Sequence, residues 1–221
     1  MKIENTLPKK LEKVMLKKES KEPCRVFVDI GSGVFPVAFV GKKEFKDNDY
    51  YVGVDRDKKK MKIGFPILDQ GEYVGGGFLK NPENLSRVGK NVFFINETVH
   101  SIPFPDSSVD EVFLGNVLGE FAIHYVDDFL LQAQRILKPG GTLIVLEIVT
   151  PSVAENRDEE GVNNFVEKFG FKKIKEVSFG DPGFKKEVSK YALHQLRYLD
   201  GGEFIVYFKK VEPENLVKPK N

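Results

Sequence analysis

The feature that most constrains the fold is an apolar run that ends in an acid and two glycines, residues 25–33 with the sequence RVFVDIGSG. Residues 26–30 show no regular polar alternation, which favours a strand covered on both faces of a parallel sheet. Glycine has no Cβ and reaches positive φ at little steric cost, so Gly31 and Gly33 permit a sharp turn and the close approach of a ligand. An ordinary glycine turn after a strand would show the same pattern. The segment therefore predicts a buried strand whose carboxyl end is a candidate ligand site.

Length and composition favour one soluble globular domain. The chain has 221 residues, of which 41% are hydrophobic and 30% are charged, enough for one sizeable core. Its 34 Lys and Arg against 33 Asp and Glu leave a net charge of +1, so no global field favours nucleic acid or membrane. The single Cys24 excludes an internal disulfide and a cysteine-built zinc site, and we expect no metal. No apolar run is long enough for a membrane span or a signal peptide, so we expect a cytoplasmic protein.

Further strands and helices alternate along the chain. Apolar runs predict strands over residues 50–55, 91–95, 109–114, 142–149, 171–179 and 203–210. One helix is expected over residues 34–43, and a second is expected to be capped by Asp127 and to end before Pro139-Gly140-Gly141. This alternation predicts an α/β fold with a doubly wound, mostly parallel sheet.

Two segments fall outside this alternation. Residues 1–22 carry apolar and lysine positions that predict a basic amphipathic helix, and we favour a docking helix with a solvated basic face over an RNA or substrate contact. Residues 56–90 form a long insertion with three lysines at 58–60 and three glycines at 75–77, and connections of this length are usually functional or mobile. We therefore expect a single domain over residues 23–215 with an insertion and an N-terminal extension.

The acid that ends the second predicted strand suggests what the ligand is. Asp55 stands where dinucleotide and nucleoside folds place a carboxylate that accepts hydrogen bonds from ribose hydroxyls. Pro36 occupies the position where a dinucleotide fingerprint needs a close-packing Gly or Ala, which speaks against NAD or FAD. Asp29 would repel a pyrophosphate but favour a ligand with an ammonium or sulfonium group. No Gly-Lys-Ser or Gly-Lys-Thr follows the turn, so the chain lacks a P-loop.

Five ordered segments resemble one family, the class I S-adenosylmethionine-dependent methyltransferases. The segments are residues 28–33, 52–55, 101–110, 114–118 and 135–143. The first is similar to the family's acid-x-Gly-x-Gly loop, and the third closely resembles its Leu-Pro-Phe segment. The resemblance implies a seven-stranded Rossmann-like sheet with an antiparallel last strand inserted near the edge, helices on both faces, and S-adenosylmethionine as cofactor. It also implies these cofactor-binding residues: Asp29, Gly31, Ser32, Gly33, Asp55, Arg56, Thr98, Val99, Asn116 and Val117.

Two departures from the family pattern keep a second class of function open. Phe35 replaces the family's third loop glycine, and Thr98 aligns with an aspartate that in many members contacts the adenine. A non-catalytic protein that keeps the cofactor pocket, or only its shape, is the alternative that these residues support.

The implied reaction is methyl transfer from a sulfonium to a nucleophilic acceptor atom. Alignment and exclusion of water are its main demands, and a general base is optional. The sequence shows no catalytic dyad; the candidate bases are His124 and His194, and Glu120 is a candidate for holding a basic acceptor. Residues 116–119 lack the Asn/Asp-Pro-Pro-aromatic run of enzymes that methylate exocyclic amino groups of nucleic acids, so a small-molecule acceptor is favoured. RNA stays open as an acceptor, and so does the oligomeric state.

Overall fold

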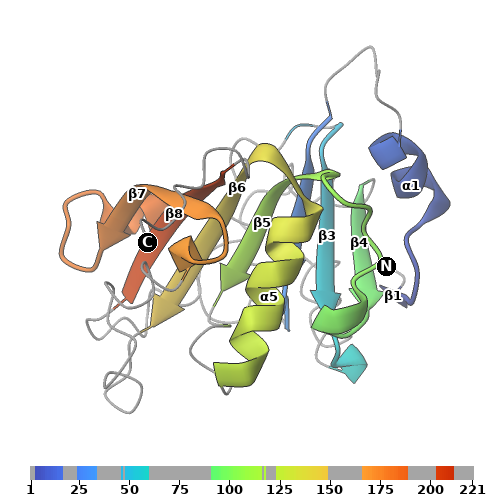
Figure 1. Ribbon diagram of the computed structural model, residues 1–221, viewed down its shortest axis with the longest axis horizontal. Coiled ribbons are helices and arrows are strands. Elements are labelled where there is room, and N and C mark those ends of the chain that lie inside the picture. Colours follow the sequence, from blue (N-terminus) through green and yellow to red (C-terminus); the bar gives the residue numbers. More distant parts are fainter. Residues whose placement is uncertain are drawn as a thin grey trace, which may run out of the picture.

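The computed structural model describes residues 3–16, 24–33, 46, 48–59, 91–115, 117, 123–148, 166–188 and 203–211. These residues form an eight-stranded sheet with the order β1-β4-β3-β2-β5-β6-β8-β7 (Figure 1). The strands are β1 (Ile3–Glu4), β2 (Val26–Ile30), β3 (Tyr50–Asp55), β4 (Val92–Asn96), β5 (Val109–Gly115), β6 (Leu137–Ile148), β7 (Phe171–Ser178) and β8 (Glu203–Lys210). The helices are α1 (Lys9–Leu16), α5 (Ile123–Ile136) and α7 (Phe184–Val188), with a 3₁₀ turn, η1, at Val99–Ser101.

The strand directions confirm the predicted α/β fold. Strands β1 to β6 pair in parallel, whereas β8 is antiparallel to both β6 and β7. The last strand is therefore inserted next to the sheet edge, as the resemblance implied. The helix expected over residues 34–43 lies outside the described residues.

The sheet has one strand more than expected, and it comes from the N-terminal extension. Ile3 and Glu4 pair in parallel with Phe94 and Ile95 of β4, so the segment expected to be helical from residue 1 begins with a strand. A two-residue strand is too short for any periodicity to reveal. The helix itself, α1, is confined to Lys9–Leu16.

Helix α1 is docked against the sheet. Leu11 is completely buried in the core, and the exposed Lys10 donates a 3.0 Å hydrogen bond to Asn91 and lies 5.6 Å from the centre of the Tyr50 ring. Lys9 and Lys13 are exposed. The described part of the N-terminal extension thus has an anchored apolar side and a solvated basic side.

The core lies between the sheet and α5, which crosses the face turned to the viewer in Figure 1. Val28 and Ile30 of β2 belong to the same buried cluster as Leu130 and Ala133 of α5. Successive residues of a strand point to opposite faces, so Asp29 faces the other side of the sheet. That side also contains buried residues, among them Tyr51 and Phe113.

Two boundaries predicted from the sequence were wrong. Helix α5 begins at Ile123, so Asp127 lies inside the helix and is not its cap. Helix α5 does end before Pro139, at Ile136, but β6 begins at Leu137 and not at residue 142 as expected, so Pro139-Gly140-Gly141 lies within the strand. The partner of β5 jumps from Leu137 to Thr142 while β5 advances from Val109 to Glu111, so the glycines bulge within the strand pair.

The amino-terminal edge of the central strands is held by a buried carboxylate. Asp49 is fully buried and accepts hydrogen bonds from the backbone N–H groups of Arg25 (3.2 Å) and Lys46 (2.9 Å). The Arg25 guanidinium also contacts the carboxylate, at 2.6 Å. This edge lies opposite the carboxyl ends of β2 and β3, where the glycine turn is found.

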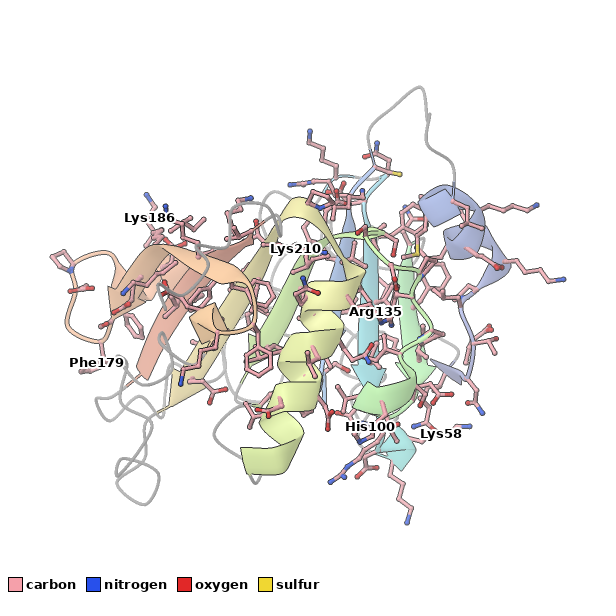
Figure 2. The ribbon with its side chains drawn as sticks, in the orientation of Figure 1. Lys58, His100, Arg135, Phe179, Lys186 and Lys210 are labelled. Atoms are coloured by element: carbon pink, nitrogen blue, oxygen red, sulfur yellow. The ribbon has the colours of Figure 1, made fainter. Side chains whose placement is uncertain are left out.

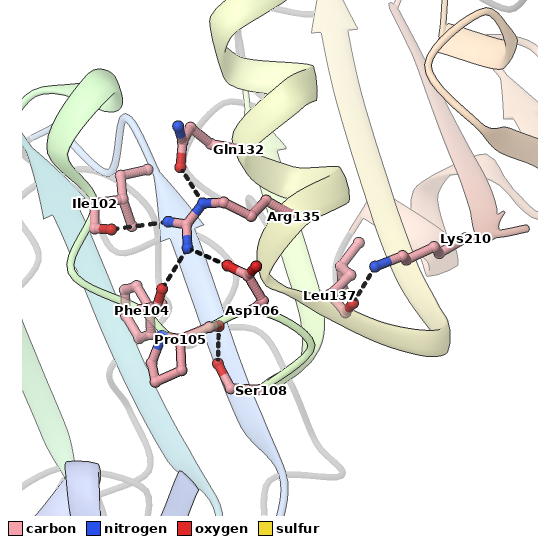
Figure 3. Close-up of polar contacts among 9 residues, drawn as sticks. All are labelled: Ile102, Phe104, Pro105, Asp106, Ser108, Gln132, Arg135, Leu137 and Lys210. Carbon is pink, nitrogen blue, oxygen red and sulfur yellow. Dashed lines mark hydrogen bonds and ion pairs between the residues drawn. The ribbon is translucent and has the colours of Figure 1, made fainter. Parts of the chain in front are cut away.

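Arg135 of α5 ties the segment before β5 to the helix (Figure 3). Its guanidinium donates to the carbonyls of Ile102 (2.9 Å) and Phe104 (2.6 Å) and to the carboxylate of Asp106 (2.8 Å). Its Nε donates to Gln132 at 2.9 Å. The planar fork of the guanidinium serves these acceptors at once, which a single ammonium group cannot do.

Replacing Arg135 with alanine is expected to lower the free energy of unfolding by about 2 kcal/mol, because the Ile102 and Phe104 carbonyls lose a charged donor. This estimated loss of stability allows for solvent screening, because the Arg135 side chain is 33% exposed. Urea unfolding would measure the loss, and Arg135→Lys should recover less than half of it. An alanine variant as stable as the native protein would show that the network contributes nothing.

Candidate functional site

The carboxyl ends of β2, β3, β4 and β5 lie at one edge of the sheet. Ile30 pairs with Val54, and Asp55 pairs with Asn96, so the loops that follow these strands are neighbours. Ligands of open α/β sheets bind at such an edge, outside the carboxyl ends of the strands.

The turn after β2 is fastened to the end of β3. Gly31 and Gly33 have φ values of 78° and 56°, a region that glycine reaches at little cost. The backbone N–H groups of Gly31 and Ser32 both donate to the Val54 carbonyl, at 2.8 and 3.1 Å. The Gly33 N–H donates to Oδ2 of Asp55 at 2.8 Å. The predicted glycine turn and the predicted acid are thus in direct contact.

Asp55 keeps acceptor capacity for a ligand. Its Oδ1 accepts the Asp57 N–H at 2.7 Å, and its Oδ2 accepts the Gly33 N–H. A carboxylate offers about four lone pairs, so each oxygen has one left after these two bonds. The side chain of Asn96 holds the backbone on the other side by donating to the carbonyls of Asp55 (3.0 Å) and Arg56 (2.9 Å). This arrangement suits a vicinal diol such as that of a ribose.

Asp29 lies within the sheet layer beneath the turn. It is only 2% exposed, and its Oδ2 accepts a 2.7 Å hydrogen bond from the Tyr51 hydroxyl. Burial, with the nearby Asp29 charge and this hydrogen bond, raises the pKa of Tyr51 well above its usual value. A cationic ligand above the turn would therefore feel the Asp29 charge through the turn and not by direct contact.

Replacing Tyr51 with phenylalanine removes this donor to a buried carboxylate and is expected to cost about 1–3 kcal/mol of stability at neutral pH. An unfolded tyrosine loses its proton at a pKa of about 10, whereas the pKa of Tyr51 in the folded protein lies higher. The stabilisation by the Tyr51 hydroxyl is therefore complete below pH 10 and is lost as the pH rises further. Urea unfolding from pH 7 to 11 should therefore show a steeper alkaline loss for the native protein. Equal pH slopes in the two proteins would contradict this assignment.

Ser32, between the two glycines, has a buried hydroxyl. Its Oγ has no hydrogen-bond partner among the described residues, and a Cβ on Gly53 would lie only 2.9 Å from it. Gly53 thus makes room for the Ser32 side chain against β3. A buried hydroxyl without a partner costs free energy, and a polar ligand seated on the turn is one way of supplying the partner.

The segment after β4 contributes η1. Thr98 is exposed and its hydroxyl lies 2.9 Å from the Ser101 hydroxyl, while Ser101 donates to Glu97 at 3.0 Å. Val99 is partly buried against the core. Figure 2 shows His100 of this turn and Lys58 at the same edge of the sheet, and Nδ1 of the exposed His100 lies 3.5 Å from Asp128 of α5.

Val117, in the segment after β5, packs against the glycine turn. Val117 is 2% exposed, and its Cγ2 lies 2.8 Å from the position that a Cβ on Gly31 would occupy. The Val117 N–H donates a 2.9 Å hydrogen bond to Oε1 of the buried Glu147 on β6. Gly31 and Val117 therefore pack together only because residue 31 has no side chain.

Of the predicted cofactor residues, Asp55 and Val117 contact the glycine turn. Asp29 lies beneath it, and Arg56, Thr98 and Val99 lie in the segments that follow β3 and β4. Asn116, Glu120 and His194 lie outside the described residues, as do Phe35, Pro36 and the side chain of His124. Sequence reasoning missed Asn96 and Glu147. Glu147 did leave a signal, because it is the one charged residue in the apolar run from Leu143 to Ile148.

Among the described residues, no three or more His, Cys, Asp or Glu side chains lie close enough together to hold a metal ion. None of the helices described is long and apolar enough to cross a membrane.

The strand order, the glycine turn and the acid that ends β3 define a Rossmann-like fold, which is similar to that of solved S-adenosylmethionine-dependent methyltransferases. Residues 77–145 match the sequence profile of a family described as "Methyltransferase domain". The resemblance drawn from the sequence is thereby confirmed at the level of fold and family profile.

Individual relatives are distant or partial. A ubiquinone/menaquinone biosynthesis C-methyltransferase from Hahella chejuensis is 38% identical over 64 residues, which cover 29% of this chain and 25% of the relative. The match thus spans about a quarter of the relative's length. A solved S-adenosylmethionine-dependent methyltransferase from Aquifex aeolicus is 21% identical with a TM-score of 0.56, covering 91% of this chain and 89% of its own. A 16S rRNA (adenine(1408)-N(1))-methyltransferase from Catenulisporales acidiphilia, solved with its cosubstrate, is 15% identical with a TM-score of 0.58, covering 94% and 93%.

Proposed function

We propose that this protein is an S-adenosylmethionine-dependent methyltransferase that acts on a small-molecule acceptor. The observation that carries the proposal is the 2.8 Å hydrogen bond from the Gly33 N–H to Asp55. It joins a turn with two glycines at positive φ to a carboxylate that still has lone pairs for ribose hydroxyls. The site and the fold are thus consistent with the donor that the family profile suggests.

The described residues fit this cofactor. The backbone of Gly31 and Gly33 would lie beneath its methionine part, Asp55 would accept from its ribose, and Thr98 and Val99 would flank its adenine. Asp29 would favour its positive charge from beneath the turn. The Ser32 hydroxyl supports a polar ligand here, because it is buried and lacks a partner among the described residues.

When bound, S-adenosylmethionine supplies an electrophilic methyl group on a sulfonium that is already a good leaving group. The protein's part is then to align the acceptor and to exclude water. Val117 and the adjacent Asn116 are proposed to flank the cofactor and face the acceptor. His124 and His194 remain candidates for a base, and Glu120 for holding a basic acceptor.

A small-molecule acceptor is favoured by the relative from Hahella chejuensis, whose name places it in ubiquinone and menaquinone biosynthesis. RNA is the second candidate, because the fold also matches a 16S rRNA methyltransferase and α1 exposes Lys9 and Lys13. A non-catalytic protein that binds the cofactor is the third. All three are compatible with a cytoplasmic setting, which we propose as well.

Calorimetry followed by methyl transfer tests this proposal. Titration with S-adenosylmethionine and with S-adenosylhomocysteine should show binding, and the absence of binding at millimolar concentration would overturn the enzyme assignment. Tritiated S-adenosylmethionine would then be offered with a quinone precursor that lacks its ring methyl, with a pool of other small aromatic and amine acceptors, or with total RNA. Label in a small molecule supports the proposal, label in RNA alone replaces it with the second candidate, and binding without transfer favours the third.

A further inference from the structure

Glu147 is a buried carboxylate that the proposed reaction does not use. It lies near the carboxyl end of β6 and is 4% exposed. The residues before it, Leu143 to Leu146, are buried and apolar. Burying an ionisable group in such surroundings is costly unless hydrogen bonds compensate it, so its position calls for a physical explanation.

The Glu147 carboxylate fixes the loop that follows β5. Its Oε1 accepts the Val117 N–H at 2.9 Å, a hydrogen bond buried at both ends. The loop leaves β5 through Gly115, where a Cβ would lie 2.6 Å from the Phe113 ring. The backbone at Val117 is thus held by a carboxyl oxygen, two residues after a point where only glycine fits.

The side chain of the residue held in this way touches the glycine turn. Val117 Cγ2 lies 2.8 Å from the position of a Cβ on Gly31, and Gly31 is itself bonded to the Val54 carbonyl of β3. A continuous line of contacts therefore runs from Glu147 through Val117 to the turn. A shift of Val117 would change the width of the space above Gly31.

We infer that Glu147 is a positioning residue of the ligand site, which sets the distance between the loop after β5 and the Gly31 turn. The role requires a hydrogen-bond acceptor at this place. A glutamine oxygen can accept the same bond, whereas a leucine of similar size cannot. The inference rests on the proposed function only for the identity of the ligand, S-adenosylmethionine.

The test compares Glu147→Gln, Glu147→Leu and Val117→Ala with the native protein. S-adenosylhomocysteine affinity is measured by calorimetry, and exchange of the Val117 amide proton by NMR. We expect Glu147→Leu to weaken binding by about 10-fold or more and to speed amide exchange, and Glu147→Gln to stay within about 3-fold on both measures. Val117→Ala keeps the hydrogen bond but removes the apolar contact with Gly31, so it should weaken binding while leaving the amide protected.

Asp49→Leu serves as the control, because Asp49 is an equally buried carboxylate at the opposite edge of the sheet that also accepts backbone N–H groups. It should lower stability and leave affinity unchanged. If Glu147→Leu does not fold, the glutamine variant still decides the matter, because a change of more than about 3-fold in its affinity or amide exchange would contradict the claim that an acceptor oxygen is what the site needs here.

Native affinity in Glu147→Leu or Val117→Ala, or an equal loss in Asp49→Leu, would overturn the inference. Failure of the native protein to bind S-adenosylhomocysteine would overturn the proposed function instead. The amide exchange of the Glu147 variants would still test the hydrogen bond in that case.

Discussion

Replacing Gly31 with valine is expected to abolish S-adenosylmethionine binding while leaving the fold largely intact. At φ 78° any residue with a Cβ is strained by about 1–2 kcal/mol. The new Cβ would also lie 2.8 Å from Val117 Cγ2, so the turn or the loop after β5 must move. Calorimetry should show affinity lower by at least about 100-fold, because a strained turn and a displaced loop both alter the site.

Gly140→Val is the matched control for this experiment. Gly140 also has a positive φ, 67°, but a Cβ there would meet no atom within 4 Å, and it lies in the bulge of β6 away from the site. Its valine variant should lose stability through backbone strain and keep its affinity. Unchanged binding in Gly31→Val would mean that the turn is not the ligand site.

Asp55→Ala is expected to weaken binding by about 1–3 kcal/mol through the loss of a charged acceptor, or roughly 5- to 150-fold. It also releases the Gly33 N–H, which Asp55 holds at 2.8 Å, so the turn loses its fastening to β3. Calorimetry with S-adenosylmethionine measures the effect, and the crystal structure of the variant would show whether the turn has moved.

Asp57→Ala provides the comparison, because Asp57 carries the same charge in the same loop and donates its backbone N–H to Asp55. The alanine variant keeps that N–H, so its affinity should stay within about 2-fold of the native value, as expected of a surface charge. Equal losses in both variants would assign the effect to the charge of the loop, and an unaffected Asp55→Ala would remove Asp55 as the ribose ligand.

The central strands were predictable from the sequence because their signals are local. Strand β3 (Tyr50–Asp55) and strand β8 (Glu203–Lys210) were both predicted with the observed bounds. An uninterrupted apolar run bounded by a turn or an acid identifies such a strand without knowledge of its partners. The ordered motifs then supplied the position of the antiparallel last strand, which periodicity alone does not reveal.

The wrong boundaries came from signals that have several meanings. An aspartate before an apolar periodicity is typical of a helix cap, yet Asp127 lies within α5, next to the Asp128 that contacts His100. A Pro-Gly-Gly sequence is typical of a turn, yet here it lies in a bulge, and the flanking residues Leu137 and Thr142 still pair with β5. In both places the tertiary partner decided the structure.

The site was predictable where one residue type suits one conformation, as in the glycine turn and the acid of the next strand. It was not predictable where a distant partner gives a residue its role. Glu147 and the Val117 N–H are separated by 30 positions, and nothing local indicates that one holds the other. The acceptor is harder still to predict, because one fold hosts many substrates and the site alone selects among them.

The two outermost strands of the sheet, β1 and β7, resist the addition of foreign strands by different means. At one edge β1 has only Ile3 and Glu4 within the part of the chain that the structure describes, and at the other the middle of β7 exposes Lys172, Lys173 and Lys175. Very short edges and lysine-rich edges are both known to oppose edge-to-edge aggregation. An expression tag placed ahead of Ile3 should therefore be polar and poor in β-branched residues, since a strand-forming tag would lengthen a two-residue edge into a template for fibre growth.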